Sequence, residues 1–196
     1  MSKPLVVWIN CYGAWDPEHR PKLENDGYGE YLDGVVDLLL AHKDTVSAVH
    51  ISGGMYDSQG KTECETTIPE LEKRLAAKGV SGWAFMADER SVTSISIVRT
   101  FLQAWKNEYP GHDALLVIDE VRYPTNAYAL EYLAEKMEMQ IPPSDQVLVS
   151  IPRPDTHPHS TPEFQAKKLE EMKEKGVEEV EREGMEARKE HLTRKS

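Results

Sequence analysis

Three acidic residues of the chain could act in catalysis: Glu63, Asp88 and Asp119. Two carboxylates held close together raise the pKa of one of them, which leaves a proton to donate. We therefore expect Glu63 and Asp88 to form an acid/base or cation-binding pair, and Asp119 to bind a ribose hydroxyl or a metal ion. No third ligand accompanies Asp119, so no metal site is predicted. In the alternative interpretation, Glu63 is a solvated loop residue and Asp88 caps a helix that begins at Ser91.

The turn Ser52-Gly53-Gly54 follows an apolar run and could hold an anion. Paired glycines let a ligand approach the backbone closely, and their amides can cradle a negative charge. We expect no room for a Cβ at Gly53 or Gly54, and amides that point into a pocket beside Glu63. Neither a G-x-G-x-x-G motif nor a phosphate-loop motif occurs, so a standard dinucleotide or nucleoside-triphosphate site is not predicted.

Two cysteines and three arginines lie near the same predicted site. Cys11 and Cys64 could be a nucleophile with its resolving partner, or a redox pair. The alternative is two unrelated thiols, one of them packed in the core. Arg90, Arg122 and Arg153 could pair with a carboxylate or phosphate of a ligand, or could form surface ion pairs.

The elements that would position these residues alternate along the chain. Apolar residues at spacings of three and four predict amphipathic helices. One begins at a capping box in residues 67–70, and another is expected to have Thr125 or Asn126 as its cap. Five β-prone runs separate these helices, at residues 5–10, 48–52, 83–86, 114–118 and 146–150. This alternation predicts a three-layer, Rossmann-like α/β sandwich with a mostly parallel sheet of five or slightly more strands. The candidate residues would then gather at the carboxyl ends of the strands, where such sheets bind ligands.

We predict three parts: a Rossmann-like domain over residues 1–150, a Pro-rich linker over 151–162 and a charged helical tail over 163–196. The tail has a sparse apolar stripe, and Gly176 and Gly184 each weaken a helix by roughly 1 kcal/mol relative to Ala. We expect a solvated helix that packs loosely or frays. The alternative is a helix that binds a partner or makes an oligomer.

Composition and charge exclude several classes. The net charge of −11 disfavours binding to nucleic acids and to anionic membranes. The apolar runs are far shorter than the ~20 residues of a membrane span, and no signal peptide is recognised. Two cysteines are too few for a disulfide framework or a zinc knuckle. We therefore expect a soluble, cytoplasmic protein.

Several motifs occur in a characteristic order: Ser52-Gly53-Gly54, then Thr62-Glu63-Cys64, a helix ending in Lys78-Gly79-Val80, and Asp88 followed by Ser91, Thr93 and Ser94. In this order the chain, over roughly residues 5–150, resembles the YdcF/SanA/ElyC-like family of domains of unknown function. The resemblance implies a Rossmann-like domain with a polar pocket at the strand ends. It also implies S-adenosylmethionine as a possible cofactor, because one branch of the family is associated with that ligand.

The chain departs from this family after the fourth predicted strand. The positions of the family's His and Arg hold Tyr123 and Asn126, and Arg122 could replace one of the lost charges.

Together these features predict a protein that binds a small anionic or nucleoside-like molecule at the strand ends. As an enzyme it would be a transferase or hydrolase that acts on this ligand. The alternative is a non-catalytic relative that binds a partner through its charged C-terminal helix. The residues predicted to contact the ligand, besides the three acids, are Cys11, Gly13, Ser52, Gly53, Gly54, Ser91, Thr93, Ser94, Arg122, Tyr123 and Asn126.

Overall fold

The computed structural model describes residues 3–11, 13, 27–55, 57, 59–152 and 161–193, with only the backbone described for 190–193. At its centre lies a sheet of five parallel strands in the order β3-β2-β1-β4-β5. This arrangement confirms the predicted α/β class and the parallel sheet. The strands are β1 (Leu5–Asn10), β2 (Val46–Ser52), β3 (Phe85–Asp88), β4 (Asp113–Asp119) and β5 (Leu148–Ile151).

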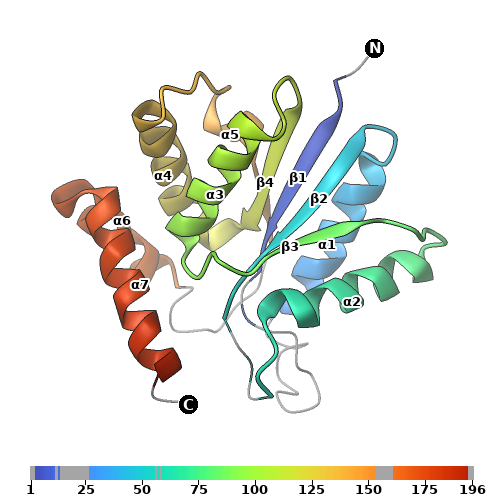
Figure 1. Cartoon of the computed structure of the whole chain (residues 1–196), viewed down its shortest axis with the longest axis horizontal. Helices are drawn as coiled ribbons and strands as arrows, with labels where there is room; N and C mark the ends of the chain where they lie inside the picture. Colours follow the sequence, from blue (N-terminus) through green and yellow to red (C-terminus); the bar gives the residue numbers. More distant parts are fainter. Residues whose placement is uncertain are drawn as a thin grey trace.

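Helices cover both faces of the sheet and make it the middle of three layers (Figure 1). One face packs against α1 (Tyr28–Ala41) and α2 (Glu63–Ala77), and the other against α3 (Ser94–Asn107) and α4 (Tyr123–Lys136). Successive side chains of a strand point to opposite faces. The β1 strand is buried throughout, so its apolar residues supply both core clusters.

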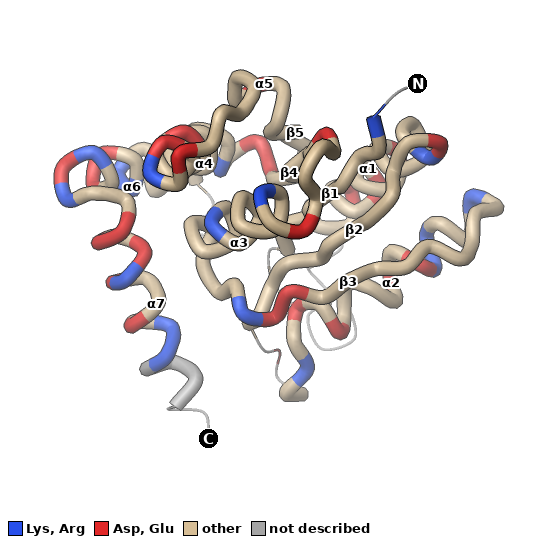
Figure 2. The backbone as a smooth tube through the Cα atoms, turned by 45° about the horizontal axis from the view of Figure 1, so that its top comes forward, with Lys and Arg blue, Asp and Glu red and all other residues tan. Residues whose placement is uncertain are grey.

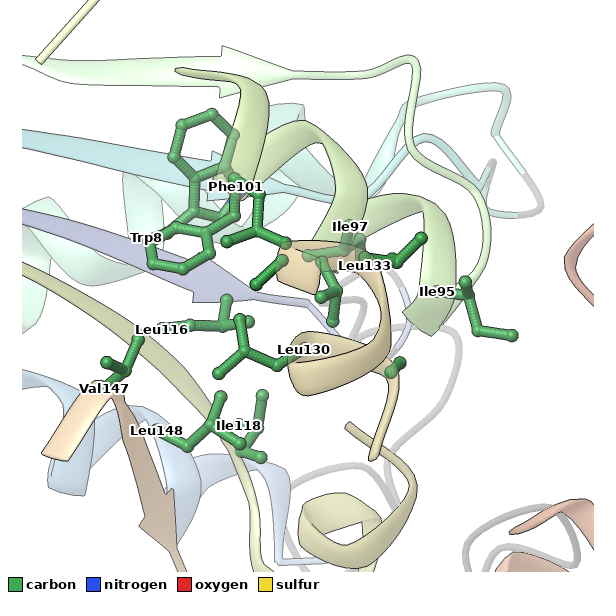
Figure 3. Packing of buried hydrophobic residues seen from close by; sticks show 14 of the residues in the cluster. Trp8, Ile95, Ile97, Phe101, Leu116, Ile118, Leu130, Leu133, Val147 and Leu148 are labelled. Atoms are coloured by element: carbon green, nitrogen blue, oxygen red, sulfur yellow. The ribbon is translucent and has the colours of Figure 1, made fainter. Parts of the chain in front are cut away.

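The core on the α3 and α4 face is built from large side chains of β1, β4 and the two helices (Figure 3). Trp8 of β1 meets Phe101 of α3 edge to face, with ring centroids 6.2 Å apart. Leu116 and Ile118 of β4 pack with Leu130 of α4 in the same cluster.

The order of the strands reverses between β1 and β4. The chain moves outward from β1 to β2 and β3, then returns to the other side of β1 to form β4 and β5. Ligands of open α/β sheets bind beside the carboxyl ends of the strands at such a switch point. In this protein Asn10 ends β1 and Asp119 ends β4 there.

Two strands begin later than the sequence prediction places them. β3 begins at Phe85 rather than at residue 83, because Phe85–Asp88 is the stretch that pairs in register with Val49–Ser52 of β2. β5 begins at Leu148 rather than at residue 146, because the short helix α5 (Ser144–Val147) precedes it.

Three helices start at other residues than expected. Thr62 caps α2 through a capping box with Glu65, so the predicted box at 67–70 lies inside the helix. Thr93 caps α3, which begins at Ser94 rather than at Ser91. The short 3₁₀ helix η1 (Glu120–Arg122) leads directly into α4. Thr125 and Asn126, which were expected to cap this helix, therefore lie inside it.

The C-terminal helices α6 (Pro162–Lys175) and α7 (Val177–Thr193) are part of the body of the protein. Figure 1 places them beside α4 and α3, with the end of α7 at the same end of the molecule as the carboxyl edge of the sheet. Met172, Val177 and Val180 are buried in the core on that face. The expectation of a loosely packed tail is therefore wrong, because these three side chains join the core beside α3 and α4, while Phe164 stays exposed.

Polar contacts also fix these two helices. The Arg99 Nε of α3 donates to Glu181 Oε2 of α7 at 3.1 Å, and the Glu181 side chain is 9% exposed. The Thr125 hydroxyl of α4 bonds the side chain of Gln165 in α6 at 2.8 Å. Of the predicted linker at 151–162, the first residue ends β5 and the last begins α6, while 153–160 lie outside the described residues.

Candidate functional site

Four predicted site residues end up at one edge of the sheet. Gly13 and Gly54 follow β1 and β2, and Asp88 and Asp119 are the last residues of β3 and β4. All four strands are parallel, so their carboxyl ends meet at this edge. The placement agrees with the sequence prediction, but the bonds of these residues differ from it.

Glu63 is a buried residue at the start of α2 and not a solvated loop acid. Its carboxylate accepts the Gly13 N–H at 2.6 Å and the Met55 N–H at 3.2 Å, and so joins the chain after β1 to the chain after β2. Burial raises the pKa of Glu63, while the two amides and the positive charges of Arg188 and Arg122 lower it. The net effect is a carboxyl group that is easier to protonate than a solvated one.

The hydrogen bonds of Asp88 are separate from those of Glu63. Its carboxylate accepts the hydroxyl of Ser52 and the Arg90 N–H, the latter at 3.2 Å. Within the part of the chain that the structure describes, no hydrogen bond joins Asp88 to Glu63. Asp88 is not a helix cap either, because Thr93 fills that role for α3. With exposed Arg90 it borders an open groove of about 480 Å³ beside His50 and α3.

The two glycines of the Ser-Gly-Gly turn have no space for a side chain. A Cβ on Gly53 would lie 2.6 Å from Glu63 Oε2, and one on Gly54 would lie 2.0 Å from the Glu89 carbonyl oxygen. This confirms the steric expectation. The expected anion cradle is wrong, because the Gly53 amide donates to the Asp88 carbonyl and the Gly54 amide to the Ser91 carbonyl, each at 3.0 Å.

The hydroxyl residues before α3 are also engaged in the fold. Ser91 is buried and bonds Thr100 at 2.9 Å. Thr93 accepts the Ser96 N–H at 3.0 Å, and Ser94 is the first residue of the helix. Their hydrogen bonds stabilise the start of α3.

Both cysteines are buried thiols in contact with each other. Cys64 donates to the carbonyl oxygens of Ile51 and Gly53, each at 3.2 Å. The hydrogen bond with Cys64 raises the pKa of Cys11 well above its ordinary value, and burial and the charge of Glu63 raise it further. A thiol in this setting is a poor nucleophile, because the thiolate is the reactive form.

Asp119 and Arg122 form a buried ion pair at the switch point. Arg122 Nη1 lies 3.1 Å from Asp119 Oδ2, and the Arg122 N–H donates to Asp119 Oδ1 at 2.8 Å. The Asp119 side chain is 1% exposed. Its carboxylate therefore fixes the guanidinium of Arg122, which leaves less of it for a ribose hydroxyl.

Unsatisfied polar atoms lie in the same region. Asn10 and Asn126 are each 1% exposed. Asn126 Nδ2 donates to the Arg122 carbonyl at 2.9 Å, but among the described residues its Oδ1 and both polar side-chain atoms of Asn10 have no hydrogen-bond partner. Tyr123, the first residue of α4, packs against the core instead. Buried polar groups normally form hydrogen bonds, so we expect a polar partner for these atoms.

Two basic residues that sequence analysis missed lie on the inward faces of α6 and α7. Lys168 in α6 follows Gln165 by three residues and precedes Met172 by four, so it shares the buried face of that helix. Arg188 in α7 follows Gly184 by four residues, and a Cβ on Gly184 would lie 3.4 Å from Thr93 of α3. Both side chains are therefore turned to the body of the protein, and both are partly buried.

The electrostatics show that Lys168, Arg188 and Arg122, here named the cation cluster, act on one another. Burial lowers the pKa of Lys168 to about 8, and the charges of Arg122 and Arg188 add to this. Burial also lowers the pKa of Arg188, where Glu63 acts in the opposite sense and Arg122 in the same sense. Neither Lys168 nor Arg188 makes a hydrogen bond or ion pair with any residue that the structure describes.

Charges on the outer sides of α6 and α7 behave differently. Figure 2 shows acidic and basic residues alternating along both helices. Arg182 pairs with Glu179 and with Glu186, and Lys175 pairs with Glu183. These exposed charges are compensated locally, whereas Lys168 and Arg188 form no ion pair with any described residue.

Comparison with protein-family models, with curated proteins and with solved structures finds no match for this chain. Among the described residues, none of the helices has the length and apolar character needed to cross a membrane. No group of three or more His, Cys, Asp or Glu residues in the described ranges has the arrangement of a metal site. The function must therefore be argued from the site itself.

Proposed function

We propose that this protein binds a small anionic molecule, of the phosphate-bearing or nucleotide type, beside the carboxyl ends of β1 and β4. The cation cluster of Arg122, Lys168 and Arg188 would hold the anion. The observation that carries the proposal is that Lys168 and Arg188 are partly buried, feel the charge of Arg122, and form no ion pair with any of the described residues.

The energetic argument is that uncompensated cations are costly in a folded protein. Taking a charge out of water has a large penalty unless an opposite charge or hydrogen bonds replace the solvent. Three like charges add their mutual repulsion to this penalty. A bound anion would remove both costs, and arginine is well suited to carboxylate and phosphate groups because its guanidinium can donate two parallel hydrogen bonds.

Two further features support the location. Arg122, which pairs with Asp119 at the end of β4, lies at the switch point of the strand order, where open α/β sheets bind ligands. Asn10 at the end of β1 and Asn126 in the first turn of α4 have side-chain polar atoms without a hydrogen-bond partner among the described residues. These atoms are suited to hydroxyl or amine groups of the ligand.

The site does not suit S-adenosylmethionine, the cofactor that the family resemblance implies. That molecule carries a sulfonium and an ammonium group against one carboxylate, so its net charge is positive. The cation cluster would repel it, and the amides of Gly53 and Gly54 already bond backbone oxygens. A phosphorylated ligand of nucleotide type fits the charge of the site better.

Glu63 is the residue that could make the protein an enzyme. Its pKa is raised by burial, and it interacts with Arg188 and Arg122 of the cation cluster. A carboxyl group with a raised pKa keeps its proton to a higher pH and can donate it to a leaving oxygen. Glu63 would then serve as general acid in a transfer or hydrolysis reaction on the bound anion.

The test is a thermal-shift titration of the whole chain with inorganic phosphate, AMP and adenosine. A ligand at 100 times its dissociation constant stabilises a protein by about 2.7 kcal/mol. We expect phosphate and AMP to stabilise the protein and adenosine to do so far less. Arg188→Gln should abolish most of the response, while Arg182→Gln, on the exposed side of the same helix, should keep it.

Two results would contradict the proposal. One is that phosphate and AMP leave the melting temperature of the wild-type protein unchanged. The other is that Arg188→Gln responds to both anions as the wild type does.

A further inference from the structure

Strand β3 lies at one edge of the sheet (Figure 2), and among the described residues it pairs only with β2. The Asp88 carbonyl oxygen accepts the N–H of Gly53, which follows β2, at 3.0 Å. The polar backbone groups of successive residues in a strand point to opposite sides, so those of Phe85 and Ala87 point away from β2. Ala87 is exposed, and its N–H and C=O are therefore open to another strand.

An open groove of about 480 Å³ lies beside this edge, between the end of β3 and α3. Its inner wall includes Trp8 and His50, whose rings stack with centroids 4.0 Å apart. His50 is fixed by a hydrogen bond of 2.8 Å between its Nε2 and the Tyr109 hydroxyl. His50 also pairs in register with Met86 of β3, so the groove is on the α3 face of the strand edge. Every second side chain of an added strand would lie on that face.

The charged residues that line the groove are mainly acidic. Asp88 and Glu89 lie at the carboxyl end of β3, and Glu108 caps the other end of the groove at the C-terminus of α3. Among the described residues that line it, only Arg90 is positive, and His50 adds no charge at neutral pH because burial lowers its pKa to about 4. The C-terminal end of a helix carries a partial negative charge, which adds to that of Glu108. The groove therefore suits positively charged side chains.

We propose that β3 and this groove bind an extended basic segment of a partner protein, which adds a strand to the edge of the sheet. The backbone of the segment would pair with Phe85 and Ala87. Its lysine or arginine side chains, at alternate positions, would enter the groove toward Asp88 and Glu108. In complexes of this kind the main-chain hydrogen bonds give affinity, and the pockets for alternate side chains give specificity.

The charge of the whole protein supports a basic partner. A net charge of −11 repels acidic segments and raises the rate at which basic ones reach the surface. The groove shares no residue with the cation cluster, so this inference is independent of the proposed function.

Ala87→Pro tests the backbone pairing. Proline removes the N–H that faces away from β2, and an edge strand tolerates proline at such a position. Ala87→Val is the matched control, because valine suits a strand and keeps the N–H. Melting curves of both variants show whether the fold is kept.

Glu108→Lys tests the charge of the groove. Glu131→Lys is its control, because Glu131 is an exposed residue of α4 that does not line the groove, and both substitutions change the net charge equally. If Ala87→Pro does not fold, this second pair of variants still decides the question.

The experiment measures the fluorescence anisotropy of a labelled peptide of alternating lysine and threonine, titrated with the protein at low salt. We expect the wild type to bind this peptide and not one in which glutamate replaces lysine. Glu108→Lys and Ala87→Pro should each weaken binding by about tenfold or more, while Ala87→Val and Glu131→Lys should bind as the wild type does.

Three results would overturn the inference. Folded Ala87→Pro that binds as tightly as the wild type would show that no strand is added. Glu131→Lys that binds as weakly as Glu108→Lys would show that only the net charge matters. Sedimentation that finds a dimer of the wild type, dissociated by Ala87→Pro, would make a second copy of the chain the occupant of this edge.

Discussion

Replacing Lys168 with methionine should make the unliganded protein more stable. Methionine has a similar length and no charge, so the substitution removes the buried cation without leaving a large cavity. The pKa of Lys168 falls from 10.5 to about 8 in the folded protein. Each pKa unit is worth about 1.4 kcal/mol, so the charge destabilises the folded state by about 3 kcal/mol at neutral pH.

The pH dependence gives the prediction a sign that can be checked. The folded protein releases the proton of Lys168 near pH 8, and the unfolded chain releases it near pH 10.5. The destabilisation is therefore present in full below pH 8 and disappears as the pH rises from 8 to 10.5. The advantage of Lys168→Met should be greatest at pH 7 and should shrink by about 2 kcal/mol at pH 10.

Urea denaturation at pH 7 and pH 10, in a buffer without phosphate or carboxylates, measures both quantities. At pH 7 the melting temperature should also rise, by on the order of 5–10 °C for a chain of this length. Lys167→Met is the control, because substitutions of exposed side chains usually change stability by less than about 0.5 kcal/mol. A Lys168→Met protein that is no more stable than the wild type at pH 7 would refute the idea that Lys168 is an uncompensated cation.

Four other substitutions test the packing and the titration of His50. Met172→Ala should lower the free energy of unfolding by about 2–5 kcal/mol in urea, because this side chain is 1% exposed in the core; a loss below about 1 kcal/mol would mean that α6 packs loosely. Gly54→Ala should destabilise the protein strongly, since its Cβ would meet a carbonyl oxygen at 2.0 Å. Gly184→Ala should raise the melting temperature slightly, since its Cβ would meet Thr93 only at 3.4 Å. A Gly54→Ala protein more stable than Gly184→Ala would contradict the geometry of the turn. The wild type should lose stability relative to His50→Gln as the pH falls from 6.5 to 4. Burial lowers the pKa of His50 to about 4, so the unfolded chain takes up the proton at a higher pH than the folded protein does. Denaturation experiments that give the two proteins the same pH profile would contradict this prediction.

The fold could be predicted from the sequence because its signals are local. Leu5–Asn10 is buried at every position, and so it has the continuous apolar pattern of a central parallel strand. The start of α2 was harder, because Thr62 with Glu65 and Thr67 with Glu70 both have the spacing of a capping box. The first pair caps the helix, and Pro69 lies inside it.

The site could be predicted only in part, because its decisive contacts join distant segments. The steric need for Gly53 and Gly54 follows from a turn motif, but the carbonyl partners of their amides come from the chain after β3. Lys168 and Arg188 lie in a charged segment that has only a sparse apolar stripe, and neither residue belongs to that stripe. Their role depends on α6 and α7 packing against α4 and α3, which no local pattern indicates.

The most direct test of the central claim is a crystal structure of the protein grown with phosphate, refined against a matched phosphate-free crystal. The account predicts a phosphate ion beside the ends of β1 and β4, with Lys168 Nζ and the guanidinium groups of Arg122 and Arg188 as its ligands. A carboxylate of the chain itself between Lys168 and Arg188, with no phosphate bound there, would contradict it.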